Sequence, residues 1–103
     1  MTKIEFYKSD TEIFYPACDY VRCNTTYRKV IYGEKIKIMS IIIDEYRNER
    51  KSLGYDFQLF SYCEIEKDNL EDILKYYRKI TINQWNNIVD LCNRKIGSFY
   101  ELK

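Results

Sequence analysis

A cluster of basic residues around one glycine is the part of this 103-residue chain that could most directly do chemistry. Arg28, Lys29 and Lys35 are close in sequence, and Gly33 stands between the last two. Cationic side chains attract phosphate groups, and a glycine lets a phosphate approach the backbone closely. If a helix begins here, its free backbone N–H groups also bind anions, pyrophosphate in particular. The segment therefore predicts an anion-binding turn, with an ordinary basic turn as the alternative.

A strand before this turn and a helix after it would hold these groups in place. The stretch from Cys18 to Cys23 is typical of a strand. Apolar residues then recur every three or four positions from Ile36 to Tyr46, which favours an amphipathic helix over 33–53 with Gly54 as its C-terminal cap. Residues 55–62 predict a second strand. Strand, helix and strand in this order imply a parallel pair with a right-handed crossover.

The flanking segments complete a prediction of the α/β class with a mixed sheet. Alternating residues predict short antiparallel strands over 3–8 and 12–15. Asp68 is a candidate N-cap for a helix over 70–78, and Thr81 or Asn83 begins a last helix that carries Trp85. Residues 98–102 are a candidate final strand. The length favours a single compact domain over 1–103, with a crossover in its middle and helices towards its C-terminus.

Two segments resemble the motifs of the GCN5-related N-acetyltransferases. In that family Arg or Gln, two residues, Gly, one residue and Gly or Ala lie between a strand and a long helix. The run Arg28-Lys-Val-Ile-Tyr-Gly33 is similar, with Ile31 where the family has its first glycine. Ile73-Leu-Lys-Tyr-Tyr77 resembles the helix that ends in the family's tyrosine. The order of elements from Cys18 to Tyr77 is also similar to the compact anti-CRISPR acetyltransferases that inactivate type V effector nucleases.

This resemblance implies a minimal acetyltransferase fold that uses acetyl-coenzyme A to acetylate an amine, such as a lysine of a partner protein like a CRISPR effector nuclease. Tyr77 would be the general acid that protonates the leaving thiolate, with a core aromatic residue as its alternative role. The general base stays open among Asp19, Glu12 and Glu64, and a homodimer would rebuild the walls of the acceptor site. The residues implied in cofactor binding are Cys23, Arg28, Lys29, Val30, Ile31, Tyr32, Gly33, Glu34 and Lys35.

Composition limits several other classes of function. Lysine and arginine total 17 against 16 acidic residues, so no net field attracts polyanions, which argues against nucleic acid as a direct ligand. The four cysteines do not form Cys-x-x-Cys pairs, which favours free thiols over a metal site. No stretch of 18 apolar residues is present, so we expect no membrane segment and a cytoplasmic location.

Two further functions stay open beside acetyl transfer. One is a non-catalytic phage or mobile-element inhibitor that acts by protein–protein contact. The eleven tyrosines and the arginines favour it, because both residue types are enriched at interface hot spots. The other is a small nucleic-acid-binding protein that uses the last two predicted helices. The first of these predicts no binding of coenzyme A.

Overall fold

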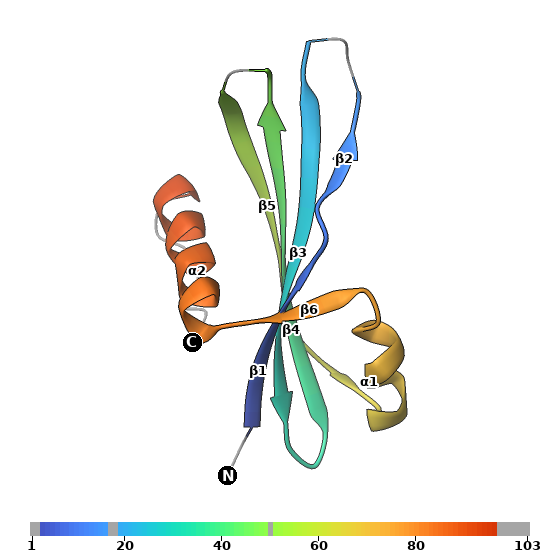
Figure 1. The fold of residues 1–103 in the computed structure, drawn as a ribbon. Helices are drawn as coiled ribbons and strands as arrows, with labels where there is room; N and C mark the ends of the chain where they lie inside the picture. The colour runs from blue at the N-terminus through green and yellow to red at the C-terminus, as the bar shows by residue number, and fades with distance from the viewer. Residues whose placement is uncertain (1–2, 17–18, 50, 97–103) are drawn as a thin grey trace.

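The computed structural model describes residues 3–16, 19–49 and 51–96, and these form a long, twisted antiparallel sheet with one helix on each face (Figure 1). The strand order is β5-β4-β3-β1-β6, and β2 pairs with the part of β3 that β1 leaves free. The elements in chain order are β1 (Lys3–Ser9), β2 (Glu12–Phe14), β3 (Val21–Tyr32), β4 (Ile36–Arg47), β5 (Ser52–Ile65), α1 (Lys67–Ile73), β6 (Tyr77–Ile80) and α2 (Ile82–Ile96).

Strands β3 and β4 form the centre of the sheet as one long hairpin. Their register is unbroken from Val21 opposite Arg47 to Ile31 opposite Lys37. Both strands are rich in β-branched and aromatic residues, which fit a pleated surface that is covered on both sides. The predicted strand over 18–23 corresponds only to the beginning of β3, and residue 18 lies outside the described residues.

The predicted helix over 33–53 is wrong, because this segment forms the turn after β3, all of β4, the following turn and the start of β5. Ile36 and Ile38 pack on the side of α1, whereas Met39, Ile41 and Ile43 pack on the side of α2. The apolar positions therefore change faces between Ile38 and Met39. This change produces spacings of three and four residues in a strand that is buried on both faces, and such spacings imitate a helix.

The predicted α/β fold with a mixed, acetyltransferase-like sheet is consequently wrong. The described strands pair only in antiparallel fashion, and β4 leads into β5 through a hairpin and not through a crossover. The predicted strands over 3–8, 12–15 and 55–62 are confirmed as β1, β2 and the central part of β5. The candidate strand over 98–102 lies outside the described residues.

Helix α2 covers one face of the sheet and contributes two fully buried side chains, Trp85 and Cys92. Trp85 and Cys92 pack against Phe6 and the β4 residues Met39 and Ile41. The predicted start of this helix is confirmed by a capping box, in which the Gln84 backbone N–H donates to Thr81 Oγ1 over 3.1 Å and the Thr81 N–H donates to Gln84 Oε1 over 2.8 Å.

Helix α1 covers part of the opposite face, as Figure 1 shows. Leu70, Ile73 and Leu74 pack around Val30, Ile36 and Ile38 of the central hairpin. The helix predicted over 70–78 is wrong in its second half, because α1 ends at Ile73 and the chain turns into β6. The Tyr77 N–H donates to the Leu74 carbonyl over 3.0 Å within that turn. Tyr77 therefore begins a strand and does not end a helix.

Candidate functional site

The outer edge of β5 is the longest strand edge that no described strand covers. β5 is the first strand in the sheet order, and its pairing partner is β4 alone. Residues 54–60 pair regularly with Ser40–Tyr46, and bulge-like register shifts flank this stretch. Backbone N–H and C=O groups along such an edge are available to another strand. We call the stretch from Gly54 to Phe60 the β5 edge.

One side of the β5 edge is apolar. Tyr55, Phe57 and Leu59 face α2 and are half-buried against the core that α2 covers. The rings of Tyr55 and Phe57 are stacked, with centroids 5.8 Å apart. Because side chains alternate along a strand, a partner strand would place every second side chain beside this row.

The other side of the β5 edge carries negative charge. Asp56 stands directly opposite Asp44 of β4, and like charges at such positions repel. Asp44 accepts a hydrogen bond from Asn24 Nδ2 over 2.8 Å and lies 3.9 Å from Arg22 Nε. Asp56 accepts a hydrogen bond from the Tyr46 hydroxyl over 3.0 Å, and this bond raises the pKa of Tyr46. No lysine or arginine of the described residues forms an ion pair with Asp56.

The sequence of β5 lacks the basic residues and prolines that commonly protect an exposed edge. Proteins commonly guard exposed edges with lysine, proline or very short strands. β6 has four residues and includes Arg78 and Lys79, and β2 has three residues. β5 has fourteen residues without a lysine, arginine or proline. Phe60 projects from it with half of its surface exposed.

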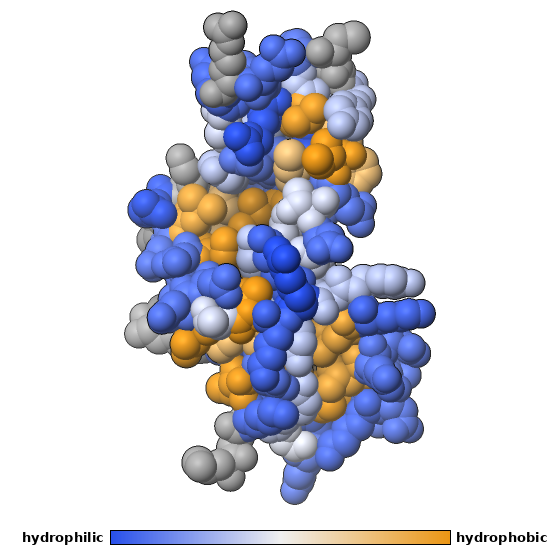
Figure 2. All heavy atoms as spheres, viewed as in Figure 1, coloured by the Kyte–Doolittle hydropathy of each residue, from blue (hydrophilic) through white to orange (hydrophobic). Residues whose placement is uncertain are grey.

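Apolar side chains on the face drawn in Figure 2 form separate patches divided by hydrophilic residues. One exposed group belongs to β2 and the residue after it, and comprises Ile13, Phe14 and Tyr15. Phe14 packs on the guanidinium of Arg22, which lies 4.5 Å from the ring centroid. Because β2 is so short, this patch offers less backbone to a partner than the β5 edge.

The structure brings Arg28 and Tyr77 together, but in a structural role. The Arg28 guanidinium lies 4.6 Å from the centroid of the Tyr77 ring, and its Nη1 donates to the Ile73 carbonyl at the end of α1 over 3.3 Å. The buried Nε atom of Arg28 has no hydrogen-bond partner among the described residues. Arg28 thus joins β3 to the turn between α1 and β6.

The other residues predicted to bind the cofactor are divided between a strand and a turn. Cys23, Lys29, Val30, Ile31 and Tyr32 belong to β3, whereas Gly33, Glu34 and Lys35 lie in the turn before β4. No helix begins after this turn, so the helix N-terminus that would have bound pyrophosphate is absent from the described chain. Lys35 forms an ion pair with Glu64 over 3.3 Å. Binding of acetyl-coenzyme A stays a prediction without that structural basis.

The three cysteines in the described residues are free thiols in different elements. Cys23 is half-buried in β3, Cys63 is exposed in β5 and Cys92 is buried in α2. Burial raises the pKa of Cys92 to about 11, so this thiol is a poor nucleophile at neutral pH.

Sequence reasoning did not identify Asp44, Tyr46 or Asp56 as functional residues. The alternation of Tyr55, Phe57 and Leu59 with Asp56 and Gln58 was a usable signal for a strand with one apolar face. It did not reveal that this strand lies at the edge of the sheet, because edge position depends on pairing between distant segments.

Comparison with protein-family models, with curated proteins and with solved structures finds no match to this chain. Neither α1 nor α2 has the length and apolar character that a helix needs to cross a membrane, and the described residues contain no other helix.

Proposed function

We propose that this chain is a non-catalytic binding protein that captures an extended, basic segment of a partner protein along the β5 edge. The observation that carries this proposal is the regular stretch from Gly54 to Phe60, whose outer edge pairs with no described strand. It has no basic residue, and its aspartate forms no ion pair among the described residues. Strand addition to an exposed sheet edge is a common mode of peptide recognition.

The two sides of the β5 edge specify the sequence pattern of the partner. Apolar side chains at alternate positions would pack beside Tyr55, Phe57 and Leu59. Lysine or arginine at the positions between them would approach Asp56, and opposite charges on adjacent strands stabilise by about 0.2–1 kcal/mol per pair. Main-chain hydrogen bonds would supply affinity that does not depend on sequence. The expected partner segment therefore alternates apolar and basic residues.

Basic segments of proteins that bind nucleic acid belong to the class of partner that this chemistry fits. Their basic side chains contact the phosphates of nucleic acid, and an acidic strand edge would compete with those phosphates. This is the kind of target that an inhibitor acting by surface contact would occupy. The identity of the partner stays a prediction, as does a CRISPR effector nuclease in that role.

Titration with two matched peptides tests the proposal. One seven-residue peptide alternates valine and lysine, and the other alternates valine and glutamate. We expect the lysine peptide to bind several-fold more tightly, because opposite charges attract at Asp56 whereas like charges repel there. Amide NMR shifts of β5 measure both dissociation constants. Equal affinities, or binding that shifts no β5 signal, would contradict the proposal.

Two lysine substitutions provide a matched comparison. Phe60→Lys places a positive charge on the side of the edge that carries Asp56, so it should weaken the binding of the lysine peptide several-fold. Tyr76→Lys changes another exposed aromatic residue, in the turn after α1, and should leave the affinity unchanged. A second copy of the chain could also occupy the edge, and sedimentation analysis that showed a peptide-resistant dimer would overturn the assignment of a basic partner.

Thermal melting with acetyl-coenzyme A separates this proposal from acetyl transfer. A ligand at one hundred times its dissociation constant stabilises a protein by about 2.7 kcal/mol, which raises the melting temperature of a domain of this size by about 10 °C or more. The binding-protein proposal predicts no such shift at millimolar cofactor. A shift of that size would favour the acetyltransferase prediction instead.

A further inference from the structure

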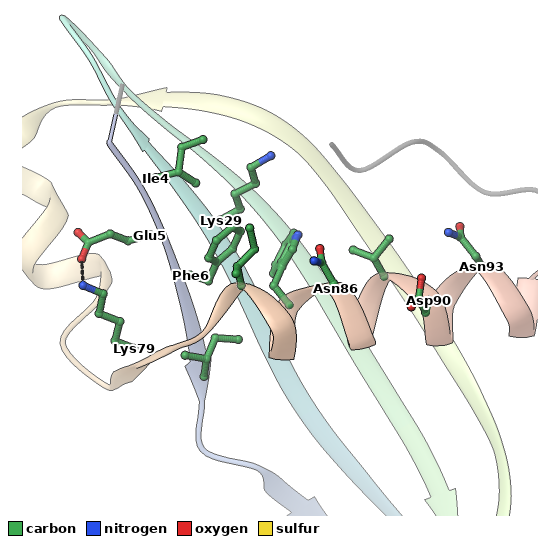
Figure 3. Close-up of a pocket in the computed structure, with 12 residues that line it drawn as sticks. Ile4, Glu5, Phe6, Lys29, Lys79, Asn86, Asp90 and Asn93 are labelled. Atoms are coloured by element: carbon green, nitrogen blue, oxygen red, sulfur yellow. Dashed lines mark ion pairs between the residues drawn. The ribbon is translucent and has the colours of Figure 1, made fainter. Parts of the chain in front are cut away.

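A second candidate site lies on the face of the sheet that α2 covers, in a groove between the first half of β1 and α2 (Figure 3). Its volume is about 760 Å³, within the range of pockets that hold small organic molecules. Apolar walls come from Ile4 and Phe6 of β1 and from Trp85 and Val89 of α2. We call this space the α2 groove.

Lys29 supplies an unusual charge to the α2 groove. It lies on β3 opposite Phe6 of β1 and Met39 of β4, and only 7% of its surface is exposed. Within the described part of the chain its ammonium contacts the ring of Tyr62, 5.7 Å from the centroid, and forms no hydrogen bond or ion pair. Most of the Lys29 side chain is buried, and its ammonium has no counter-charge among the described residues, so it can pair with an anionic ligand in the groove.

The carboxylates that border the α2 groove do not neutralise Lys29. Glu5 pairs with Lys79 and with Lys3, and Figure 3 shows the Lys29 side chain pointing away from that pair. Asp90 is exposed on α2 and makes no ion pair with Lys29. Asp90 does add negative charge to the wall of the groove, which disfavours a dianion such as phosphate. A single negative charge fits better.

Asn93 adds a second unsatisfied group to the α2 groove. Its side-chain Oδ1 is buried and has no hydrogen-bond partner among the described residues. A buried acceptor without a donor is unfavourable, so a ligand with an N–H or O–H group would be favoured there.

We propose that the α2 groove binds a small organic carboxylate with an apolar body, whose negative charge pairs with Lys29 and whose hydrogen-bond donor reaches Asn93. The apolar body lies between Ile4, Phe6 and Trp85. This inference goes beyond partner binding at the β5 edge and concerns different residues, so either site can fail its test without the other.

Three small probes test the chemistry on the wild-type protein. The probes are 4-hydroxyphenylacetate, its uncharged amide, and phenylacetate without the hydroxyl. Trp85 is the only tryptophan in the chain, so its indole N–H signal reports directly on the groove by NMR. We expect 4-hydroxyphenylacetate to shift this signal and to bind at least tenfold more tightly than the amide. Phenylacetate should bind a few-fold more weakly than 4-hydroxyphenylacetate.

Lys29→Met removes the charge and keeps an apolar chain of similar length. It should weaken the binding of 4-hydroxyphenylacetate about tenfold or more, because a hydrogen-bonded charge is lost. The melting temperature should stay the same or rise. Lys37→Met changes an exposed lysine of β4 and is the matched control, with no expected effect. Equal affinity for acid and amide would overturn the proposal. An unmoved Trp85 signal at about 10 mM 4-hydroxyphenylacetate, on the order of the weakest useful dissociation constant, would also overturn it. So would phosphate binding as tight as that of 4-hydroxyphenylacetate.

Discussion

Glu5 shows how a single residue depends on elements that are distant in sequence. Its carboxylate is buried and lies between Lys3 of the same strand and Lys79 of β6. The hydrogen bond from Lys79 holds the pKa of Glu5 at about 2, below its ordinary value of 4.5, although burial opposes this shift. Hydrogen bonds from Tyr32 and Lys3 lower the pKa of Glu5 further.

The low pKa of Glu5 makes the free energy of unfolding depend on pH in the acidic range. Between about pH 4.5 and pH 2 the unfolded carboxyl group takes up a proton before the folded one does, so stability is lost as the pH falls through this window. Over this pH range we expect the free energy of unfolding of the wild-type protein to fall by about 1–2 kcal/mol more than that of Glu5→Gln. The difference is modest because water screens the exposed lysines. Denaturant titrations at several pH values measure it. Parallel profiles for wild type and Glu5→Gln would refute the assignment.

Arg28 and Lys29 lie in a different setting from the predicted one, because both belong to β3 and not to a turn. Arg28 and Lys29 were expected to act together in a turn. On a strand, adjacent side chains point to opposite faces. Arg28 therefore packs on Tyr77 near α1, while Lys29 enters the groove beside α2. An anion-binding role stays a prediction for Lys29, in a site of different geometry.

Elements were predicted well where apolar and polar residues alternate with the period of the element. β1 and α2 show the expected periods of two and 3.6 residues, and the capping box of Thr81 and Gln84 marked the start of α2. β4 was not predicted, because helices on both faces of the sheet let it be apolar on both of its own faces. Its five isoleucines were the signal for a strand, since β-branched residues favour sheets.

Gly54 illustrates a residue whose importance was recognised for the wrong reason. It was expected to cap a helix, but it lies in β5 beside a register shift, with a φ of +147° that L-residues rarely adopt. Gly54→Ala should destabilise the fold by about 1–3 kcal/mol through backbone strain, although its Cβ would meet no atom within 4 Å. Gly33→Ala is the control, because Gly33 lacks a positive φ and its added Cβ would make an ordinary contact. Equal melting temperatures for the two variants would contradict this account.

The capping box of α2 gives a second prediction at the scale of elements. Thr81→Ala removes the hydroxyl that accepts the Gln84 N–H, and should cost about 1 kcal/mol of unfolding free energy. Thr81→Ser keeps that acceptor and should retain most of the stability. Urea unfolding of both variants measures the difference, and a neutral Thr81→Ala would show that α2 is held by Trp85 packing alone.

The whole molecule is elongated, and this shape leaves strand edges accessible. The radius of gyration is 15.0 Å and the extents are 48 × 30 × 20 Å, whereas a compact domain of 100 residues has a radius of gyration of about 13 Å. The two helices cover the middle and lower parts of the sheet, so the hairpins extend beyond them (Figure 1). The sequence predicted several strands correctly but not their order, because local patterns do not contain the pairing of β1 with β3 and β6.

Amide hydrogen exchange along β5 tests the central claim, that the β5 edge receives a basic strand, most directly. In the free protein, residues 55–60 should alternate between slow amides paired with β4 and fast amides directed to solvent. The alternating valine–lysine peptide should slow the fast amides and leave the slow ones unchanged. Fast amides that stay fast while the peptide is bound would contradict strand addition at the β5 edge.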